Sequence, residues 1–276
     1  MIMKVRMINR KPDRHLSIFL TLLPFALVLL AYVVGSEIRL AENPSDKLLP
    51  GLHSFADAIA RVAFEPDKRS GDYLLWSDTL ASMARLGCGM LVATLIGMTV
   101  GVHIGLLPMF RAGLLPFVTV ISMLPPLAVL PILFIVFGLG EVAKVALIVI
   151  GITPVIIRDI ALRVEEIPRE QLIKAQTLGA SSWQLALRVI LPQVWPRLID
   201  AVRLTLGSAW LFLIAAEAIA AQSGLGYRIF LLRRYLAMDT ILPYVAWITF
   251  LAFSLDFLLR RAQSLLFPWF TAERGR

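Results

Sequence analysis

The sequence predicts an all-α membrane protein with about six transmembrane helices. Of its 276 residues, 58% are hydrophobic and only 17% are charged, and the mean hydropathy is +0.79. Several stretches reach the ~20 apolar residues that a helix needs to cross the ~30 Å hydrocarbon layer. This composition excludes a soluble or disordered chain, and the single cysteine excludes an internal disulfide. The net charge of +8 fits basic cytoplasmic loops better than nucleic-acid binding.

Six apolar stretches are the expected membrane spans. Two of them, Leu16 to Gly35 and Leu86 to Leu107, contain no charge. The third, Ala112 to Gly140, is also uncharged, but four prolines interrupt it, so we expect one kinked span followed by a turn near Gly138. The remaining spans carry an occasional charge and cover Val142 to Leu162, Leu198 to Ala221 and Thr240 to Leu259.

The distribution of basic residues predicts that both termini are cytoplasmic. The chain opens with Lys4, Arg6, Arg10, Lys11 and Arg14, and its long first apolar run lacks a convincing cleavage site, so we interpret it as a retained helix. Most Lys and Arg residues lie in this segment, near Arg111, between 158 and 203, and after 256, which the positive-inside rule places in the cytoplasm. The predicted organisation is an N-terminus with the first helix (1–35), an external loop (36–77), a transmembrane domain (78–262) and a cytoplasmic tail (263–276).

The external loop contains one predicted helix, between His53 and Phe64. Phe55, Ile59 and Val62 recur there at helical spacing, with charged residues on the opposite face. We expect this amphipathic helix to lie on the outer surface. A simple cover over the bundle is preferred to a contact with a partner.

The second span carries a small residue at every fourth position, which makes a ridge along one face of the helix. Such a ridge lets another helix approach closely, and its partner is either within the subunit, which we prefer, or in a second subunit or moving surface. We expect Cys88 and His103 on the same helix to be packed side chains. The histidines are scattered, so the sequence predicts neither a metal site nor a catalytic centre. The ridge comprises Gly89, Ala93, Gly97, Gly101 and Gly105.

Two features of the spans are candidates for a substrate passage or contact. Prolines in the third span free backbone carbonyls, which a membrane tolerates only beside protein or a water-filled cavity. This region therefore either borders a passage or is a static kink. Its residues are Ser122, Met123, Pro125 and Pro126. Glu217 is an ionisable residue in the fifth span and either contacts the substrate or, as we prefer, accepts hydrogen bonds from freed backbone donors.

The loop between the fourth and fifth spans predicts two short helices joined by a glycine. Leu172, Ala175 and Leu178 form an apolar stripe, and Gly179 can end the first helix. Ser181 or Ser182 can then cap a second helix that reaches Pro192. A compact helical projection of this kind can fit a groove on a soluble partner.

The same loop resembles the "EAA" loop of ABC importer permeases. That pattern is E-A-A, three residues, G, nine residues and I-x-L-P, which Ala175, Gly179, Val189 and the pair Leu191-Pro192 match in type and spacing. Ile173 and Lys174 replace the leading Glu and Ala. Between Trp76 and Trp269 the chain is also similar to the nitrate/sulfonate/taurine branch of these permeases, through 124–131, 137–141, 223–227 with Glu217, and 256–261.

The resemblance implies a type-1 ABC importer permease fold in a bacterial inner membrane, with a cytoplasmic coupling helix. It implies a second permease copy, expected to be identical, two ATPase subunits that bind ATP and Mg, and an external solute-binding protein. The chain itself has no GxxxxGK[ST] motif and is expected to be a transport subunit, not an enzyme. The coupling loop spans about 163–197, and its expected contact residues are Leu172, Ala175, Leu178, Gly179, Ala180, Ser181, Ser182 and Trp183.

The solute implied by the resemblance is small and polar, like nitrate, sulfonates, taurine or bicarbonate, and a urea- or guanidine-type compound is the alternative. An anion would favour arginines at the outer side, which otherwise serve as interfacial anchors, the preferred interpretation; a cation would favour Glu217 and Glu141. A passive channel, a secondary transporter and an intramembrane enzyme are more remote alternatives. The arginines are Arg85, Arg228, Arg233 and Arg234.

Overall fold

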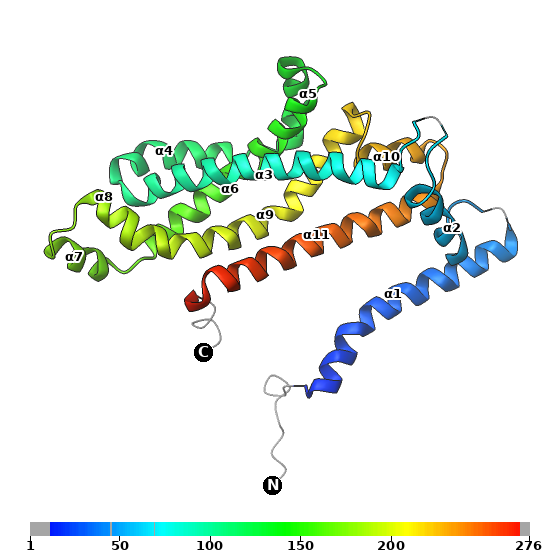
Figure 1. Cartoon of the computed structure of the whole chain (residues 1–276), viewed down its shortest axis with the longest axis horizontal. Coiled ribbons are helices and arrows are strands. Elements are labelled where there is room, and N and C mark those ends of the chain that lie inside the picture. The colour runs from blue at the N-terminus through cyan, green and yellow to red at the C-terminus, as the bar shows by residue number, and fades with distance from the viewer. Residues whose placement is uncertain (1–11, 45, 69, 271–276) are drawn as a thin grey trace, which may run out of the picture.

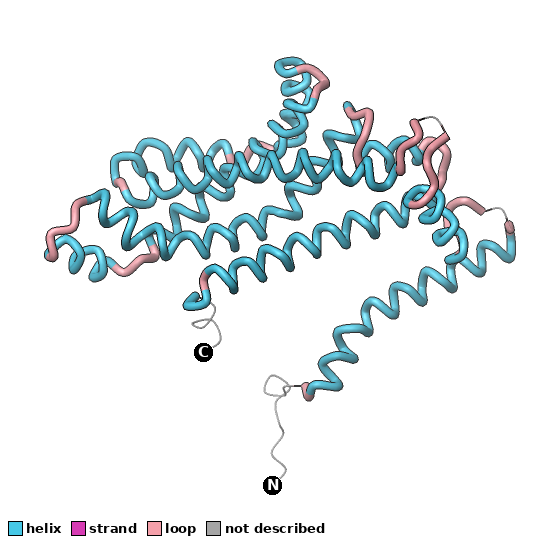
Figure 2. The backbone as a smooth tube through the Cα atoms, viewed as in Figure 1, coloured by secondary structure: helices cyan, strands magenta, loops and turns pink. Residues whose placement is uncertain are grey.

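The computed structural model describes residues 12–44, 46–68 and 70–270, and every regular element in these ranges is a helix (Figure 2). The basic segment from Lys4 to Lys11 and the end of the tail lie outside the described residues. The helices are α1 (Arg14–Glu42), α2 (Leu52–Ala63), α3 (Leu74–Leu106), α4 (Pro108–Ile121), α5 (Pro126–Phe137), α6 (Glu141–Glu165), α7 (Arg169–Thr177), α8 (Ser182–Leu185), the π-helical segment η2 (Ala186–Ile190), α9 (Leu191–Ala220), α10 (Leu225–Arg233) and α11 (Met238–Leu266).

Within the described ranges, five helices are long and apolar enough to cross a membrane, or six if the bent pair α4 and α5 forms one span. The five are α1, α3, α6, the continuous helix Ser182–Ala220 and α11. The prediction of an all-α protein with about six spans is confirmed. The third predicted span is not one kinked helix but two helices, α4 and α5, which meet at 93° across the Ser122–Pro125 connection.

The long helices α3, α6, α9 and α11 form the bundle, with α2 and α10 at one end and α7 and α8 at the other (Figure 1). The short helix α5 stands away from the bundle, and α1 diverges from it. Almost all of α1 is exposed in the single chain. Its far end is held by hydrogen bonds from the Tyr32 hydroxyl to the Pro50 carbonyl (2.7 Å) and from the Ser36 hydroxyl to the Leu49 carbonyl (2.9 Å).

The core of the bundle is the interface between α3 and α6. The small-residue ridge of α3 faces a ridge of β-branched residues on α6, and both ridges repeat every four residues, which is the spacing that interlocks two helices. A Cβ added at Gly101 would lie 2.8 Å from the Ile160 Cβ and 2.9 Å from the Ile157 carbonyl oxygen. The small-residue ridge therefore packs within one subunit, against Ile148, Ile156, Ile160 and Val164.

Three side chains lie differently from the prediction. The amphipathic helix α2 exists, but it buries Ala58 and Val62 and leaves Ile59 exposed. Cys88 and His103 are exposed in the single chain and not packed. They stand one and two positions from the glycine ridge of α3, and at ~100° of rotation per residue this turns them away from α6.

Candidate functional site

The backbone conformation of Gly179 and a backbone hydrogen bond beside it fix the connection between α7 and α8. Helix α7 ends at Thr177, and Gly179 adopts a left-handed conformation (φ 85°), which a residue without Cβ reaches at no steric cost. This conformation lets the Ala180 N–H donate to the Ala175 carbonyl at 3.0 Å. The predicted helix end at Gly179 is confirmed.

Helix α8 begins with a capping box. The Gln184 N–H donates to the Ser181 hydroxyl at 3.3 Å, and the Ser181 N–H donates to the Gln184 side-chain oxygen at 2.9 Å. Of the two predicted caps, Ser181 is therefore the one used. The second helix reaches Pro192, as predicted, but it is not short, because it continues without a break to Ala220. Pro192 lies in the first turn of α9, directly after the π-helical segment η2, where a missing N–H is tolerated.

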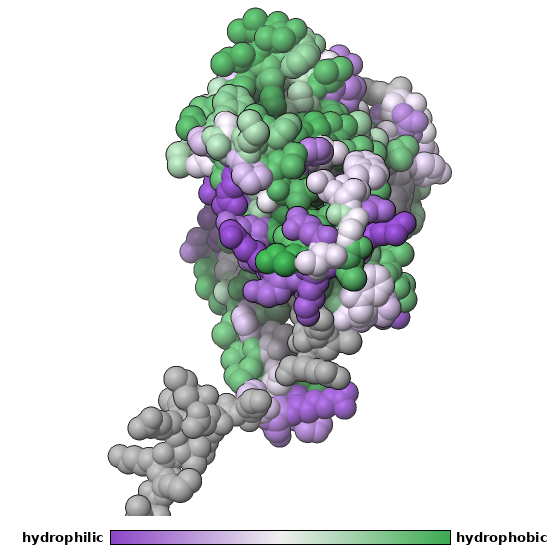
Figure 3. Space-filling model, turned by 90° about the vertical axis from the view of Figure 1, so that its left-hand side faces the viewer, coloured by the Kyte–Doolittle hydropathy of each residue, from purple (hydrophilic) through white to green (hydrophobic). Residues whose placement is uncertain are grey.

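The segment from Arg169 to Leu185, which we call the knob, presents apolar side chains to solvent. Leu172 and Ala175 pack against the core and hold the knob to the bundle. Leu178 is 88% exposed and Trp183 is 72% exposed, so Leu178 lies outside the predicted stripe and points away from the bundle. Viewed from this end, polar side chains gather on the face and apolar side chains cover the flanks of the bundle (Figure 3). Exposed apolar groups on a polar end face are typical of a contact surface.

A cluster of charged side chains, the polar centre, lies at the other end of the bundle between α3, α6, α9 and α10. Its middle is Glu217, which is fully buried. The Glu217 carboxylate accepts hydrogen bonds from the Ser82 hydroxyl (2.8 Å), from Arg85 Nη1 (2.7 Å) and from the Gly226 N–H (2.9 Å). The Leu225 N–H in turn donates to the Ser82 hydroxyl at 2.8 Å. These bonds join the turn at 223–226 to α3 and α9.

Ion pairs extend the polar centre on both sides. Glu141 accepts hydrogen bonds from Arg85 and from Lys144 Nζ, the latter at 2.7 Å. Asp78 accepts from Arg228 Nε at 2.7 Å and from the Gly224 N–H at 2.9 Å, and the Tyr244 hydroxyl lies at 3.3 Å. The cluster therefore matches three carboxylates, Asp78, Glu141 and Glu217, with three cations, Arg85, Lys144 and Arg228.

This pairing changes the interpretation of four predicted residues. Arg85 and Arg228 are not interfacial anchors, because carboxylates from other helices bind them inside the chain. Glu141 and Glu217 are likewise occupied by cations of the same chain. Glu217 also accepts from a backbone donor, the Gly226 N–H, as predicted. Arg233 and Arg234 remain exposed, and Arg233 lies over the Phe230 ring. Sequence reasoning missed Asp78, Ser82 and Lys144, although a lysine inside an apolar span is a signal in itself.

The break between α4 and α5 lies apart from the polar centre. Ser122, Met123, Pro125 and Pro126 form or flank the connection, and Met123 is exposed. The Ser122 hydroxyl accepts a hydrogen bond from Arg158 Nη1 at 2.9 Å. Glu217 lies near Glu141 at the other end of α6, because Arg85 binds both carboxylates. Arg158 follows Glu141 by 17 positions, so the break beside Arg158 and Glu217 are ~25 Å apart along the bundle. The structure does not bring these residues together, and their place in a translocation path stays a prediction.

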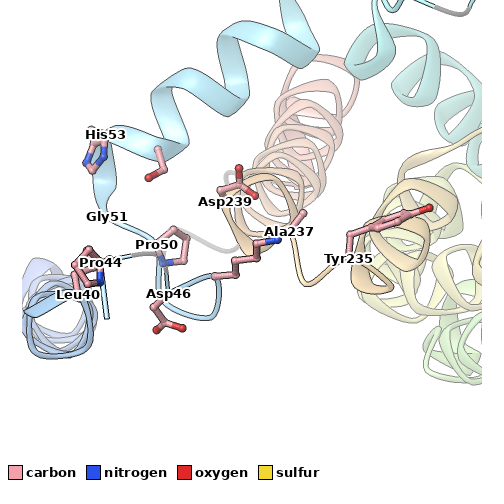
Figure 4. Close-up of a pocket in the computed structure, with 11 residues that line it drawn as sticks. Leu40, Pro44, Asp46, Pro50, Gly51, His53, Tyr235, Ala237 and Asp239 are labelled. Carbon is pink, nitrogen blue, oxygen red and sulfur yellow. The ribbon is translucent and has the colours of Figure 1, made fainter. Parts of the chain in front are cut away.

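A depression of about 370 Å³ lies between the α1–α2 connection and the α10–α11 connection. Figure 4 shows that its polar side chains do not converge, because Tyr235 points away from His53 and Asp46 is directed outward. The hydrogen bond from Arg39 lowers the pKa of Asp46, and Asp239 pairs with Arg61. In the described part of the chain, no three His, Cys, Asp or Glu residues gather as a metal site would require.

Comparisons with known proteins decide the family. Residues 93–272 match the model of the family described as "Binding-protein-dependent transport system inner membrane component". The chain belongs to this family. It is 37% identical to the taurine transport system permease protein TauC of Escherichia coli over 198 residues, 72% of each chain. It is 29% identical to the nitrate import permease protein NrtB of Synechococcus elongatus over 74% of each chain, and 31% identical to that organism's bicarbonate transport system permease protein CmpB over 58% of each.

The fold is also that of a solved permease. The structure matches a chain of the inward-facing MetNI methionine ABC transporter with a TM-score of 0.59 and 21% sequence identity, covering 67% of this chain and 93% of the other. The predicted resemblance to ABC importer permeases of the nitrate/sulfonate/taurine branch, and the type-1 permease fold, are confirmed. The protein is a multi-pass membrane permease of a transport system, not an enzyme.

Proposed function

We propose that this chain forms the translocation path of an ATP-driven importer for a small oxyanion or sulfonate, such as taurine, nitrate or bicarbonate, delivered by an external binding protein. The named substrates of its relatives support this class of solute. None of those names is a urea- or guanidine-type compound, so that alternative is not favoured. A second, identical copy of the chain would complete the path.

The exposed knob is the observation that carries the proposal. Two ATPase subunits, which bind ATP and Mg, would each dock on one knob through Leu178 and Trp183, side chains that the bundle leaves uncovered. The knob end and both chain termini are then cytoplasmic, and the end with α2 and α10 is external. Because α8, η2 and α9 form one continuous helix, a displacement of the knob acts directly on the bundle.

The docking role is tested by changing the knob without changing the bundle. Leu178→Glu places a charge where an apolar contact is expected, and Gly179→Pro is incompatible with φ 85°. Loss of a docking contact of ~2 kcal/mol or more predicts a drop of ~30-fold or more in binding of the ATPase subunits. ATP-dependent uptake of labelled taurine and nitrate by proteoliposomes should fall with it.

The matched control is Leu178→Met, which keeps an apolar side chain at the same position and should retain both binding and uptake. Yield and thermal stability of the purified permease show whether each variant has inserted and folded. If the Leu178→Glu complex retains its ATPase subunits and its ATP-dependent uptake, the knob is not the docking site.

A further inference from the structure

A groove of about 450 Å³ between α4 and α6 is a second polar feature, separate from the polar centre. Helix α6 is largely buried, yet Val155, Arg158 and Leu162 form an exposed stripe along it at helical spacing. Across the groove lie Thr119 and Ser122, at the end of α4 where the chain turns into α5. The groove therefore opens beside the proline-rich break.

Arg158 is the charged group of this groove that has no counter-ion in the described part of the chain. Arg111 pairs with Glu165 (2.6 Å), and Asp159 pairs with Arg163 (3.3 Å). Arg158 instead donates one hydrogen bond to the Ser122 hydroxyl, which itself donates to the Thr119 carbonyl at 2.8 Å. A guanidinium group carries five N–H donors, so most of those on Arg158 remain available to a ligand.

The depth of Arg158 shows what kind of surroundings its charge needs. It lies ~25 Å from the outer end of α6 at Glu141 and ~10 Å from the other end at Glu165, at 1.5 Å per residue. At ~10 Å from the helix end, a lipid-facing arginine would extend its long side chain to the membrane surface, but Arg158 instead donates to Ser122 across the groove. The polar lining of the groove, which includes Thr119 and Asp159, is therefore better explained by an aqueous path than by lipid.

We infer that Arg158 is the anion contact of the inner part of the translocation path. Planar guanidinium binds nitrate, bicarbonate or a sulfonate through paired N–H donors, and Ser122 holds the group at the break between α4 and α5. This inference rests on the proposed function, because it requires an anionic group on the cargo. The positive-inside rule assigned Arg158 to the cytoplasmic loops, whereas this inference assigns it to the translocation path.

The first experiment measures the charge of the groove without transport. In the full chain in membrane vesicles, Cys88→Ser removes the native thiol and Thr119→Cys places a new one in the groove. A negatively charged sulfonate methanethiosulfonate should then react about tenfold faster than a positively charged trimethylammonium one, after correction for their rates with a free thiol, because a single nearby charge attracts one reagent and repels the other. Arg158→Gln should abolish this preference, and Arg158→Lys should retain it.

The second experiment measures uptake of labelled nitrate and taurine by the reconstituted complex. Arg158→Gln should lower ATP-dependent uptake at least tenfold, with the ATPase subunits still bound. The matched control is Arg260→Gln, an exposed arginine of α11 outside the groove. Its partner Asp256 also pairs with Arg203, so this change leaves no carboxylate unpaired and should retain uptake.

The outcomes separate the two proposals. If the wild-type complex imports both anions and Arg158→Gln does so equally well, the inference is overturned and the proposed function stands. If neither reagent reaches Thr119→Cys, the groove is closed to water and the inference is again overturned. If the wild-type complex imports neither anion, the proposed function fails, and the reagent preference alone then decides whether Arg158 makes the groove selective for anions.

Discussion

Replacing Gly101 by alanine tests how closely α3 and α6 are interlocked. The added Cβ would lie 2.8 Å from the Ile160 Cβ and 2.9 Å from the Ile157 carbonyl oxygen, whereas ordinary contacts of a Cβ begin at 3.4 Å. One obstacle is backbone and the other is a fully buried β-branched side chain, so neither can rotate aside. The two helices must therefore separate by about 0.6 Å along this part of the interface.

The cost is isolated by a control on the same helix. An added Cβ at Gly87 would meet no atom within 4 Å, so Gly87→Ala gains the same helix propensity, ~1 kcal/mol, without the clash. Overpacking a core costs ~1–3 kcal/mol, and this range is the expected difference in the free energy of unfolding between the two variants. It corresponds to a factor of roughly 5–150 in the unfolding equilibrium.

The measurement is reversible unfolding of the purified permease in mixed micelles of increasing SDS content, followed by tryptophan fluorescence. Gly87→Ala should be as stable as the wild type or more stable, and Gly101→Ala should unfold at lower SDS. Equal stability of the two variants would show that α3 and α6 can separate at no cost, which would refute the interlocked packing.

Two further predictions concern the polar centre and the knob. Glu217→Gln keeps the shape of the side chain but leaves Glu141 as the one carboxylate bound to Arg85 in the described part of the chain. We expect the free energy of unfolding to fall by ~3 kcal/mol in the same titration, against less than ~1 kcal/mol for Asp256→Asn in a partly exposed pair. A loss no larger than that of Asp256→Asn would contradict a buried pair. Ser181→Ala removes the cap of α8 and should weaken local protection from hydrogen exchange at Ser182–Leu185 by ~1 kcal/mol, with exchange elsewhere unchanged. Unaltered exchange there would show that the capping box does not hold the helix.

Local features of the chain could be predicted from the sequence because their causes lie within a few residues. The length of the apolar stretches, the period of four in the α3 ridge and the helix end at Gly179 are all of this kind. Leu178 was misplaced for the same reason. It follows the last residue of α7, so the helical period that links Leu172 and Ala175 no longer applies to it.

The polar centre could not be predicted, because its partners are far apart in the sequence. Arg85 meets Glu141 across 56 positions and Glu217 across 132, and no periodicity reports such a meeting. The sequence did show isolated charges within apolar spans, and each such charge is costly in a membrane. Glu217 was identified on that ground, and Lys144 and Arg158 satisfy the same criterion within Val142 to Leu162.

The two ends of the continuous helix Ser182–Ala220 have different mechanical roles under the proposed function. At one end Glu217 accepts hydrogen bonds from three groups, two on α3 and one at Gly226, and at the other end the exposed knob is attached through Leu172 and Ala175. Over 39 residues the helix is ~58 Å long, so a push on the knob has a long lever arm about a fixed point at the polar centre. Because α3 and α6 are interlocked, they resist sliding past each other, and the chain can yield more easily at the 93° break between α4 and α5. That break borders the groove of Arg158, so a movement that begins at the knob would change the access of water and anions to this cation.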